Sequence, residues 1–448
     1  MGVLVAALLA ALTGAACSSD SNGGSGGAAG SGGRGASSSG GSAGTGGGSG
    51  TGGSAGTGGS AGTGGSAGSS TGSSARPNPC DAPRSGPVFR VSPSGTDNPD
   101  CTESAPCRTL QHAAEVADTP GAVILVADGT YDGFHTVHPN VTFAADGDAV
   151  VVNTSHRWSS GATGDNINVE DTDGVTIDGF KVRDADRTGI RVANARSVVL
   201  CNNVSGPNGR WGILTGFAPG VQIFHNETFG SAGEHGIYVS NSNGSGDAPL
   251  IVGNHAHDNN VNGIQLNGDC HAGGDGTIDG AILDGNIVHD NGAKGLSLIS
   301  APGVHVENNL IYENGTNAGA GGIHLVKEPD CPDSQASSGG VVVNNTVVEP
   351  RIAALRASDG ATRNVIFNNV FVSPRGAPDE VGGNDFSNNL MANDVTGLFA
   401  PGGYQLAPGS PALGACVASY AGQVAPSLDI VGAQRRATSC NQGAYETP

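Results

Sequence analysis

The sequence predicts an all-β fold in which short strands wind into a parallel β-helix. Three observations lead to this prediction. Gly accounts for 77 of the 448 residues and aromatic residues for only 4%, so the core must be thin and aliphatic. An asparagine recurs within one repeating phrase at steps of 20 to 36 residues. Short runs of alternating apolar residues flank each copy, as expected for strands.

The repeat reads apolar-x-apolar-x-x-Asn-x-apolar, followed by a second asparagine and then Gly-Ile-x-Leu. Three short strands per repeat of about 22 residues, in parallel register from coil to coil, form a solenoid of this kind. We expect the asparagines to serve the turns and to stack on one another, because the side chain bonds nearby backbone and tolerates left-handed conformations. The first series is Asn203, Asn226, Asn254, Asn286, Asn309, Asn345, Asn369 and Asn389, with Gly179 in the same place one repeat earlier. The second is Asn259, Asn291 and Asn314.

The chain begins with segments that precede the repeat. Residues 1–16 are an apolar run that ends in small residues, which predicts a secretory signal too short for a comfortable membrane span. The phrase LTGAAC resembles a bacterial lipoprotein box, so lipidation of Cys17 and plain secretion are the two alternatives. Residues 17–79 are mostly Gly, Ser, Ala and Thr and predict a disordered tether. Residues 109–117 predict a short amphipathic helix capped by Thr109, and residues 122–133 a strand and turn.

The formal net charge of −20 argues against nucleic acid as a partner, because that partner needs clustered Lys and Arg. An acidic polysaccharide would need a local basic groove or a bridging cation. The nine cysteines fit an exported chain that keeps disulfides. One is Cys17, and the others form the expected pairs Cys101–Cys107, Cys270–Cys331 and Cys416–Cys440, with Cys80 and Cys201 left over and paired only by default.

Residues from about 85 to 448 resemble the right-handed parallel β-helix proteins related to polysaccharide lyases. VSPSGTDN at 91–98 resembles that family's N-terminal cap, and SPALGAC at 410–416 with QGAYE at 442–446 resembles its closing segment. The resemblance implies a right-handed, single-stranded solenoid with a short capping helix over 80–398, closed by 399–448. It also implies an extracytoplasmic protein that acts on or binds an extracellular polysaccharide. Whether it is an enzyme stays open, because this fold hosts lyases, hydrolases, epimerases and binding proteins.

Three long insertions, at 240–249, 267–280 and 326–340, follow the Gly-Ile-x-Leu strand. Long loops on one face of a repeat protein often form its binding face, although loop drift without function is an alternative. The columns beside these loops carry aromatic and polar side chains that suit sugar rings and hydroxyls. The candidate binding residues are Arg191, Trp211, Asn262, Gln265 and His324. A solvated strand face is the alternative for this set.

Lys294 is the candidate catalytic base for β-elimination from a uronic acid chain, with His235 or Tyr238 as proton donor or alternative base. An ordinary surface lysine is the alternative. One calcium-dependent pectate lyase family with this fold has Asp-Asp-Gly-Phe-Asp at the corresponding turn, whereas residues 234–238 here read EHGIY. That site therefore cannot be transferred to this chain. A non-catalytic surface lipoprotein that binds glycan or another cell surface is the second functional hypothesis.

Calcium is the one cofactor that the sequence indicates, through Asp269, Asp275 and Asp279 in a single loop. Asp258, Asp290 and Glu313 occupy one place in successive repeats, where we expect a solvated ladder. The neighbouring His257 and His289 are expected to be turn residues. We expect a monomer whose partner is a polysaccharide and which meets a membrane only through an N-terminal lipid anchor.

Overall fold

The computed structural model describes residues 76–152, 164–317, 319–379 and 382–446. The predicted signal, Cys17 and almost all of the predicted tether lie outside these residues. Within the described ranges, no helix has the length and hydrophobicity needed to cross a bilayer. The chain enters the fold through η1 (Pro79–Asp81), β1 (Val88–Val91), α1 (Leu110–Val116), β2 (Val123–Asp132) and β4 (Thr142–Val152).

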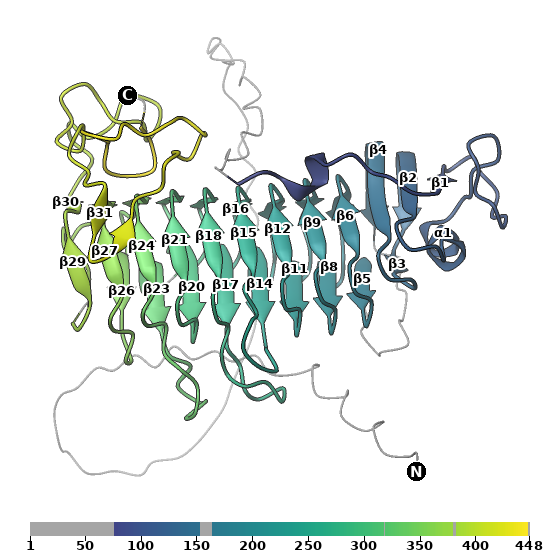
Figure 1. The fold of residues 1–448 in the computed structure, drawn as a ribbon, viewed down its shortest axis with the longest axis horizontal. Helices are drawn as coiled ribbons and strands as arrows, with labels where there is room; N and C mark the ends of the chain where they lie inside the picture. Colours follow the sequence, from purple (N-terminus) through teal and green to yellow (C-terminus); the bar gives the residue numbers. More distant parts are fainter. Residues whose placement is uncertain (1–75, 153–163, 318, 380–381, 447–448) are drawn as a thin grey trace, which may run out of the picture. The chain divides into compact units, whose positions relative to one another are not determined.

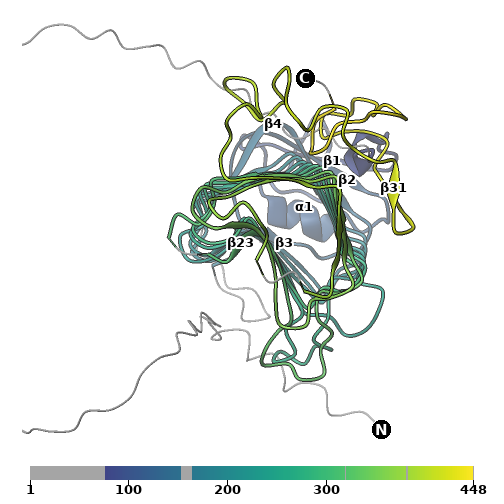
Figure 2. The same cartoon turned by 90° about the vertical axis from the view of Figure 1, so that its left-hand side faces the viewer.

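The predicted capping helix is confirmed. The Thr109 hydroxyl accepts a hydrogen bond from the backbone N–H of His112 at 3.2 Å, which satisfies one of the free amides at a helix start. The strand predicted at the start of 122–133 is β2, which continues as far as Asp132, and the chain then passes through Gly133 into the other sheet. In the end-on view of Figure 2, α1 lies across the N-terminal end of the coils.

The seven coils that follow have three strands each, as predicted, whereas the described residues of the last two coils form only the first and second strands. The first strands are β6 (Thr176–Asp178), β9 (Val199–Cys201), β12 (Gln222–Phe224), β15 (Leu250–Val252), β18 (Ile282–Asp284), β21 (His305–Glu307), β24 (Val341–Val343), β27 (Val365–Phe367) and β29 (Asp385–Ser387). The second strands are β7 (Lys181–Arg183), β10 (Val204–Ser205), β13 (Glu227–Phe229), β16 (His255–His257), β19 (Ile287–His289), β22 (Leu310–Tyr312), β25 (Thr346–Val348), β28 (Val370–Val372) and β30 (Leu390–Ala392).

The third strands form a sheet of their own. They are β3 (Phe134–His135), β5 (Ile167–Glu170), β8 (Thr188–Ala193), β11 (Trp211–Gly216), β14 (Ile237–Ser240), β17 (Ile264–Asn267), β20 (Leu296–Ile299), β23 (Gly321–Val326) and β26 (Ala353–Ala357). All pair in parallel with their equivalents in the next coil, which gives one sheet of 21 strands and one of nine (Figure 1). Winding each coil through both sheets brings residues of successive repeats into straight rows.

Aliphatic columns fill the space between the sheets. Ile213 of β11 pairs in register with Ile190 on one side and Ile237 on the other, and all three are fully buried. Columns of this kind run through a single cluster of buried side chains from Val91 to Phe371. Burial of such side chains contributes about 25 cal/mol per Å² of apolar surface removed from water, so a core with few aromatic rings is sufficient here.

The first asparagine series forms the predicted ladder at the corner between the first and second strands. Asn309, for example, accepts hydrogen bonds from the backbone N–H and the side-chain amide of Asn286, both at 2.9 Å, and donates to Asn345 Oδ1 at 2.9 Å. The placement of Gly179 in this series is wrong by one residue. The amide of Phe180 donates to Asn203 Oδ1 at 3.0 Å, so Phe180 holds the ladder position, while Gly179 has a φ of +80° in the preceding turn.

The second asparagine series also stacks, and it ends on an acid. Asn259, Asn291 and Asn314 bond to one another in order. Asn314 then donates from its backbone N–H and its side-chain amide to the two carboxyl oxygens of Glu349, both at 2.8 Å. Glu349 is fully buried, and burial raises its pKa to about 8, although the Asn314 bonds oppose this.

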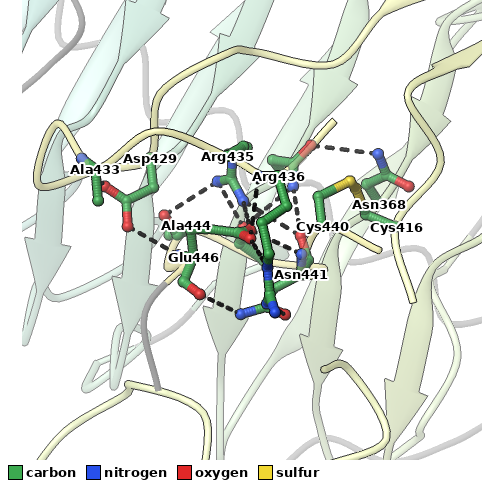
Figure 3. Close-up of polar contacts among 12 residues, drawn as sticks. Asn368, Cys416, Asp429, Ala433, Arg435, Arg436, Cys440, Asn441, Ala444 and Glu446 are labelled. Carbon is green, nitrogen blue, oxygen red and sulfur yellow. Dashed lines mark hydrogen bonds and ion pairs between the residues drawn. A yellow bond between two sulfur atoms is a disulfide. The ribbon is translucent and has the colours of Figure 1, made fainter. Parts of the chain in front are cut away.

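The C-terminal segment includes a short hairpin of β31 (Ser419–Tyr420) and β32 (Gln423–Val424) and is held to the coils by a buried polar cluster (Figure 3). Arg435 donates to Asn308 Oδ1 at 2.8 Å and to the carbonyl of Gly443 at 2.9 Å. Glu446 accepts from the Nε–H of Arg436 at 2.7 Å. The structure also confirms the predicted disulfide pairs, which are Cys80–Cys201, Cys101–Cys107, Cys270–Cys331 and Cys416–Cys440.

Candidate functional site

The three long insertions lie beside one another at one edge of the nine-stranded sheet, as predicted. They follow β14, β17 and β23, and hang below those strands in Figure 1. The Asn241 side-chain amide donates to the carbonyl of Asp269 at 3.0 Å, and Asp279 accepts from the amide of Gly246 at 2.9 Å. The Cys270–Cys331 disulfide joins two of the loops across an intervening coil. These contacts join the three loops into one continuous group beside the sheet.

One row of outward-facing residues crosses the nine-stranded sheet, one residue per coil, and we call it the central row. The strand register aligns three of the predicted binding residues, Arg191, Gln265 and His324, in this row. In order, the central row contains Arg191, Leu214, Tyr238, Gln265, Ser297, His324 and Arg356. Many of its members are more buried than a solvated strand face would be, because neighbouring side chains cover them.

Trp211 and Tyr238 meet at one part of this face. Their rings stack with centroids 6.1 Å apart, and the guanidinium of Arg210 lies 4.3 Å from the centre of the Trp211 ring. Arg210 is held in turn by Glu234 at 3.0 Å. The Tyr238 hydroxyl accepts from the amide of Asn267 at 2.9 Å. This arrangement fixes the aromatic rings in place, since a cation above a ring and a stacked neighbour both favour one orientation.

His235 packs edge-on against Tyr238, with ring centroids 5.1 Å apart. Burial lowers the pKa of His235 to about 3, and the nearby charges of Lys294 and Arg210 add to this effect. The neutral ring accepts a hydrogen bond at Nδ1 from the backbone of Asn262 at 3.2 Å, so its proton lies on Nε2. A base needs a free lone pair, and Nδ1 of His235 is already occupied.

Lys294 lies close to two histidines. Its charge contributes to the lowered pKa of His235 and also to that of His324, which burial lowers to about 3. His324 bonds through Nε2 to the hydroxyl of Ser358 at 3.1 Å. Both rings are therefore neutral near pH 7, and the lysine is the cationic group between them. Among the three predicted catalytic residues, Lys294 and Tyr238 can each accept a proton once they are deprotonated, whereas Nδ1 of His235 is occupied.

The remaining predicted binding residues are engaged within the protein. Arg191 is 6% exposed, pairs with Glu170 at 3.1 Å and donates to Asn168 at 2.8 Å. Asn262 donates to Gln265 at 2.5 Å and accepts from the backbone of Lys294 at 3.0 Å. These hydrogen bonds and ion pairs fix the orientation of the Arg191 and Asn262 side chains. The two residues therefore form part of the surface of the sheet and do not project from it.

An arginine-lined pocket of about 330 Å³ lies at the far end of the central row, and sequence reasoning missed it. Arg351, Arg356 and Arg375 line it together with Asp379, which pairs with Arg375 at 2.6 Å. Arg356 follows Leu355, which pairs in register with Ile323. The sequence does contain a sign of this strand, because Ala354-Leu355 stands where Gly-Ile stands in the other copies of the repeat.

The predicted calcium residues are not brought together. Asp269 accepts from the backbone of His271 at 2.8 Å, Asp275 from that of Thr277 at 3.0 Å, and Asp279 from the 246–247 turn. Among the described residues, three groups have ligand atoms mutually within 4.8 Å, and none contains these acids. Two of those groups contain Cys101 with Cys107 or Cys270 with Cys331, whose sulfurs are in disulfides. The third is Glu227 with His255 and His257.

The prediction that His257 and His289 are turn residues is wrong. They close strands β16 and β19 and pair with each other in register. The acids that follow them do occupy equivalent turn positions, since Asp258, Asp290 and Glu313 have φ values of +53°, +52° and +55°.

Comparison with known proteins defines the class. The family profile described as "Right handed beta helix region" matches residues 224–395. Among solved structures, XylC in complex with xylose is similar over 80% of this chain and 98% of its own, with 10% identity and a TM-score of 0.50. The pectate lyase Pel9A (17% identity, 81% and 96% covered, TM-score 0.47) and the mannuronan C-5 epimerase AlgE6 A-module of Azotobacter vinelandii (15%, 62% and 92%, 0.40) are also similar.

The chain is therefore a right-handed parallel β-helix protein, as the sequence resemblance implied. No curated protein matches the sequence. Sequence identities at this level establish the fold but not the activity, which depends on the residues of the site.

Proposed function

We propose that this protein binds a linear acidic polysaccharide along the outward face of its nine-stranded sheet. The observation that carries the proposal is the arginine-lined pocket at the end of the central row, on a chain whose net charge is −20. A guanidinium binds a carboxylate through two parallel hydrogen bonds. A local basic site of this kind is what an acidic polymer needs on an acidic protein.

Several features of the face support this proposal. Parallel coils lie about 4.8 Å apart, so the central row offers one side chain per coil to an extended chain. Trp211 and Tyr238 provide ring surface at one end, and Lys294 lies between that end and the arginine pocket. The disulfide-joined loops border the same sheet. The polymer would run across the strands from the rings to the arginines.

β-Elimination is the second candidate activity, and the position of Lys294 between two neutral histidines favours it. In this reaction Lys294 Nζ, once deprotonated, removes the C5 proton of a uronic acid. The electron pair forms the C4–C5 double bond as the C4–O4 bond breaks, and the Tyr238 hydroxyl donates the proton that the leaving oxygen needs. An arginine from the pocket neutralises the carboxylate, which acidifies the C5 proton.

Binding is tested with the full-length chain and a panel of polyuronates and neutral glucans. We expect polyuronates to bind, and Arg356→Gln to weaken their binding at least about tenfold, because one lost charge-assisted contact is worth about 1.5–3 kcal/mol. Arg363→Gln is the matched control, since Arg363 is exposed and does not line the pocket. Equal binding of neutral glucans, or equal affinity in the two variants, would contradict the proposal.

Turnover is followed separately by the ultraviolet absorbance of unsaturated uronate ends. A lyase would produce these ends with the wild type and with Lys181→Gln, and not with Lys294→Gln. Binding without such products would leave the protein as the non-catalytic glycan-binding alternative.

The location of the protein is part of the same proposal. Four disulfides fit a chain that folds outside the cytoplasm, and Cys17 would carry a lipid that anchors it. In an exporting bacterial host, labelled fatty acid should be incorporated into the wild type and not into Cys17→Ser. Incorporation into neither would favour plain secretion.

A further inference from the structure

A column of stacked rings lies on the 21-stranded sheet, outside the face described above. Phe229, His257, His289 and Tyr312 come from four successive coils, and neighbouring rings are nearly parallel, with centroids 5.5, 5.1 and 4.6 Å apart. His255 lies beside the column, with its ring centroid 4.3 Å from that of His257. The fold therefore concentrates three imidazoles in one place on rigid strands.

Glu227 joins this cluster from the preceding coil. It pairs in register with His255, so the two side chains start about one coil spacing apart. His255 and His257 flank the buried Ala256 on β16, and alternate residues of a strand point to the same face. As a result, one carboxylate oxygen and one nitrogen of each ring lie mutually within 4.8 Å.

The hydrogen bonds around the cluster orient the rings. His257 Nδ1 lies 2.7 Å from Asp258 Oδ2, and its Nε2 points at Glu227 Oε1 at 3.1 Å. A carboxylate on the far nitrogen is the usual partner of a histidine that ligates a metal, because it fixes the tautomer and the ring plane. A cation between His257 Nε2 and Glu227 would replace the proton that now has to lie there.

His255 has a nitrogen with no partner. His289 bonds through Nδ1 to Asp290 at 2.8 Å, and its Nε2 lies 2.7 Å from Nε2 of His255. Nδ1–H of His289 donates to the carboxylate of Asp290. Nε2 of His289 therefore has a lone pair and accepts the hydrogen bond that His255 donates from its own Nε2–H. Nδ1 of His255 then keeps its lone pair and is buried without a hydrogen bond. A buried imidazole lone pair without a donor is an unusual and costly arrangement.

We infer that Glu227, His255 and His257 form a binding site for one divalent transition-metal ion of the zinc class. Two imidazoles and a carboxylate favour zinc, copper, nickel or iron over calcium and magnesium, which prefer oxygen ligands alone. Metal–ligand distances of about 2.0–2.1 Å place tetrahedral ligand atoms about 3.4 Å from one another, so side-chain rotation would bring the three ligand atoms, now within 4.8 Å of one another, to that separation. Such an ion would join two successive coils, and a position stays open for water or for His289.

The inference is tested with the full-length chain after treatment with a chelator. Equilibrium dialysis should show one Zn²⁺ or Co²⁺ per chain, and bound Co²⁺ should give the visible absorption bands of a low-coordinate site. His255→Gln and Glu227→Gln should each weaken binding at least about tenfold, since even outer-shell changes cost 10–100-fold. His305→Gln should bind as the wild type does. It is a matched control because His305 lies on the same sheet and faces Glu307 at 3.2 Å, without a second histidine.

Two outcomes would overturn the inference. One is the absence of a stoichiometric ion and of visible Co²⁺ bands in the wild type, which does not depend on any variant folding. The other is equal affinity in His255→Gln, Glu227→Gln and His305→Gln, with circular dichroism showing that all three are folded. Displacement of Co²⁺ by an equal concentration of Ca²⁺ would also contradict the proposed ligand chemistry.

Discussion

A single amide side chain explains why asparagine recurs at the corners of this fold. Each ladder asparagine offers one oxygen that accepts two hydrogen bonds from the coil before it, and one amide that donates to that coil's backbone and to the next asparagine. Asn345, for example, accepts from Asn309 twice and donates to the carbonyl of Val306 and to Asn369. An acid lacks the donor, and an apolar residue lacks both groups. Buried backbone amides at the corner would then lose their partners, at about 1–3 kcal/mol each.

Glu349 breaks this rule at the end of the second ladder, and it should make stability depend on pH. Its ordinary pKa of 4.5 applies to the unfolded chain, whereas burial raises the folded value to about 8. Between these values the folded protein holds a proton that the unfolded chain has lost, so stability falls as the pH rises from about 4.5 to about 8. The expected loss is on the order of 5 kcal/mol, and urea unfolding at several pH values measures it.

Glu349→Gln is the matched variant for this prediction. Glutamine stays neutral and keeps an oxygen for Asn314, so its unfolding free energy should lack the Glu349 contribution and fall less over the same pH interval. The difference between the two proteins isolates this residue from other groups that titrate. Identical pH profiles would mean that Glu349 is not protonated in the folded protein.

At the scale of the element, the sequence predicted what is local and repetitive. The Gly-Ile strands and the helix cap at Thr109 each depend on residues a few positions apart, and the asparagine ladders repeat one local phrase from coil to coil. The errors occur where strands have only two or three residues, because alternation cannot be seen over so short a run. The sequence placed His257 and His289 in turns for this reason. Each is followed by an aspartate whose backbone is in the left-handed region.

The candidate site was less predictable than the fold. Register placed Trp211, Tyr238 and Lys294 on one face correctly, because the repeat fixes which residues align. It could not show that Arg191 and His235 are buried among neighbouring side chains, since burial depends on contacts between coils. The arginine pocket was missed because the segment at 373–379, which supplies Arg375, packs beside β26 from a later part of the chain.

The loops at the edge of the nine-stranded sheet should owe much of their order to one disulfide. Cys270–Cys331 closes a segment with a sequence separation of 61, whereas Cys101–Cys107 has a separation of 6. Chain entropy predicts that removal of the first costs about 4 kcal/mol and removal of the second about 2 kcal/mol. The double serine variants, compared by urea unfolding and by proteolysis of the 326–340 loop, test this difference. A larger loss for Cys101 and Cys107 would contradict it.

For the molecule as a whole, positive charge is unevenly distributed. The chain has 20 Lys and Arg against 40 Asp and Glu. Seven of these 20 lie on or beside the face proposed for polysaccharide: Arg187, Arg191, Arg210, Lys294, Arg351, Arg356 and Arg375. Asp165, Glu170, Glu234 and Asp379 pair with four of these cations, so the face keeps a small excess of positive charge on a chain whose net charge is −20. An acidic polymer would therefore be directed to this one face.

The C-terminal segment closes the fold through Arg435, and the last prediction concerns that contact. Arg435 is 5% exposed and bonds to Asn308 and to the carbonyls of Asn441 and Gly443. Arg435→Ala leaves Asn308 Oδ1 without its donor, and it leaves the buried carboxylate of Glu446, 3.7 Å from the guanidinium, without its buried cation. We therefore expect the free energy of unfolding to fall by about 3–5 kcal/mol. Arg436 pairs with the same Glu446 from a side chain that is 56% exposed, so Arg436→Ala should cost no more than about 1 kcal/mol. Urea unfolding of both variants decides the matter, and equal losses would show that the buried cluster of Figure 3 does not hold the closing segment in place.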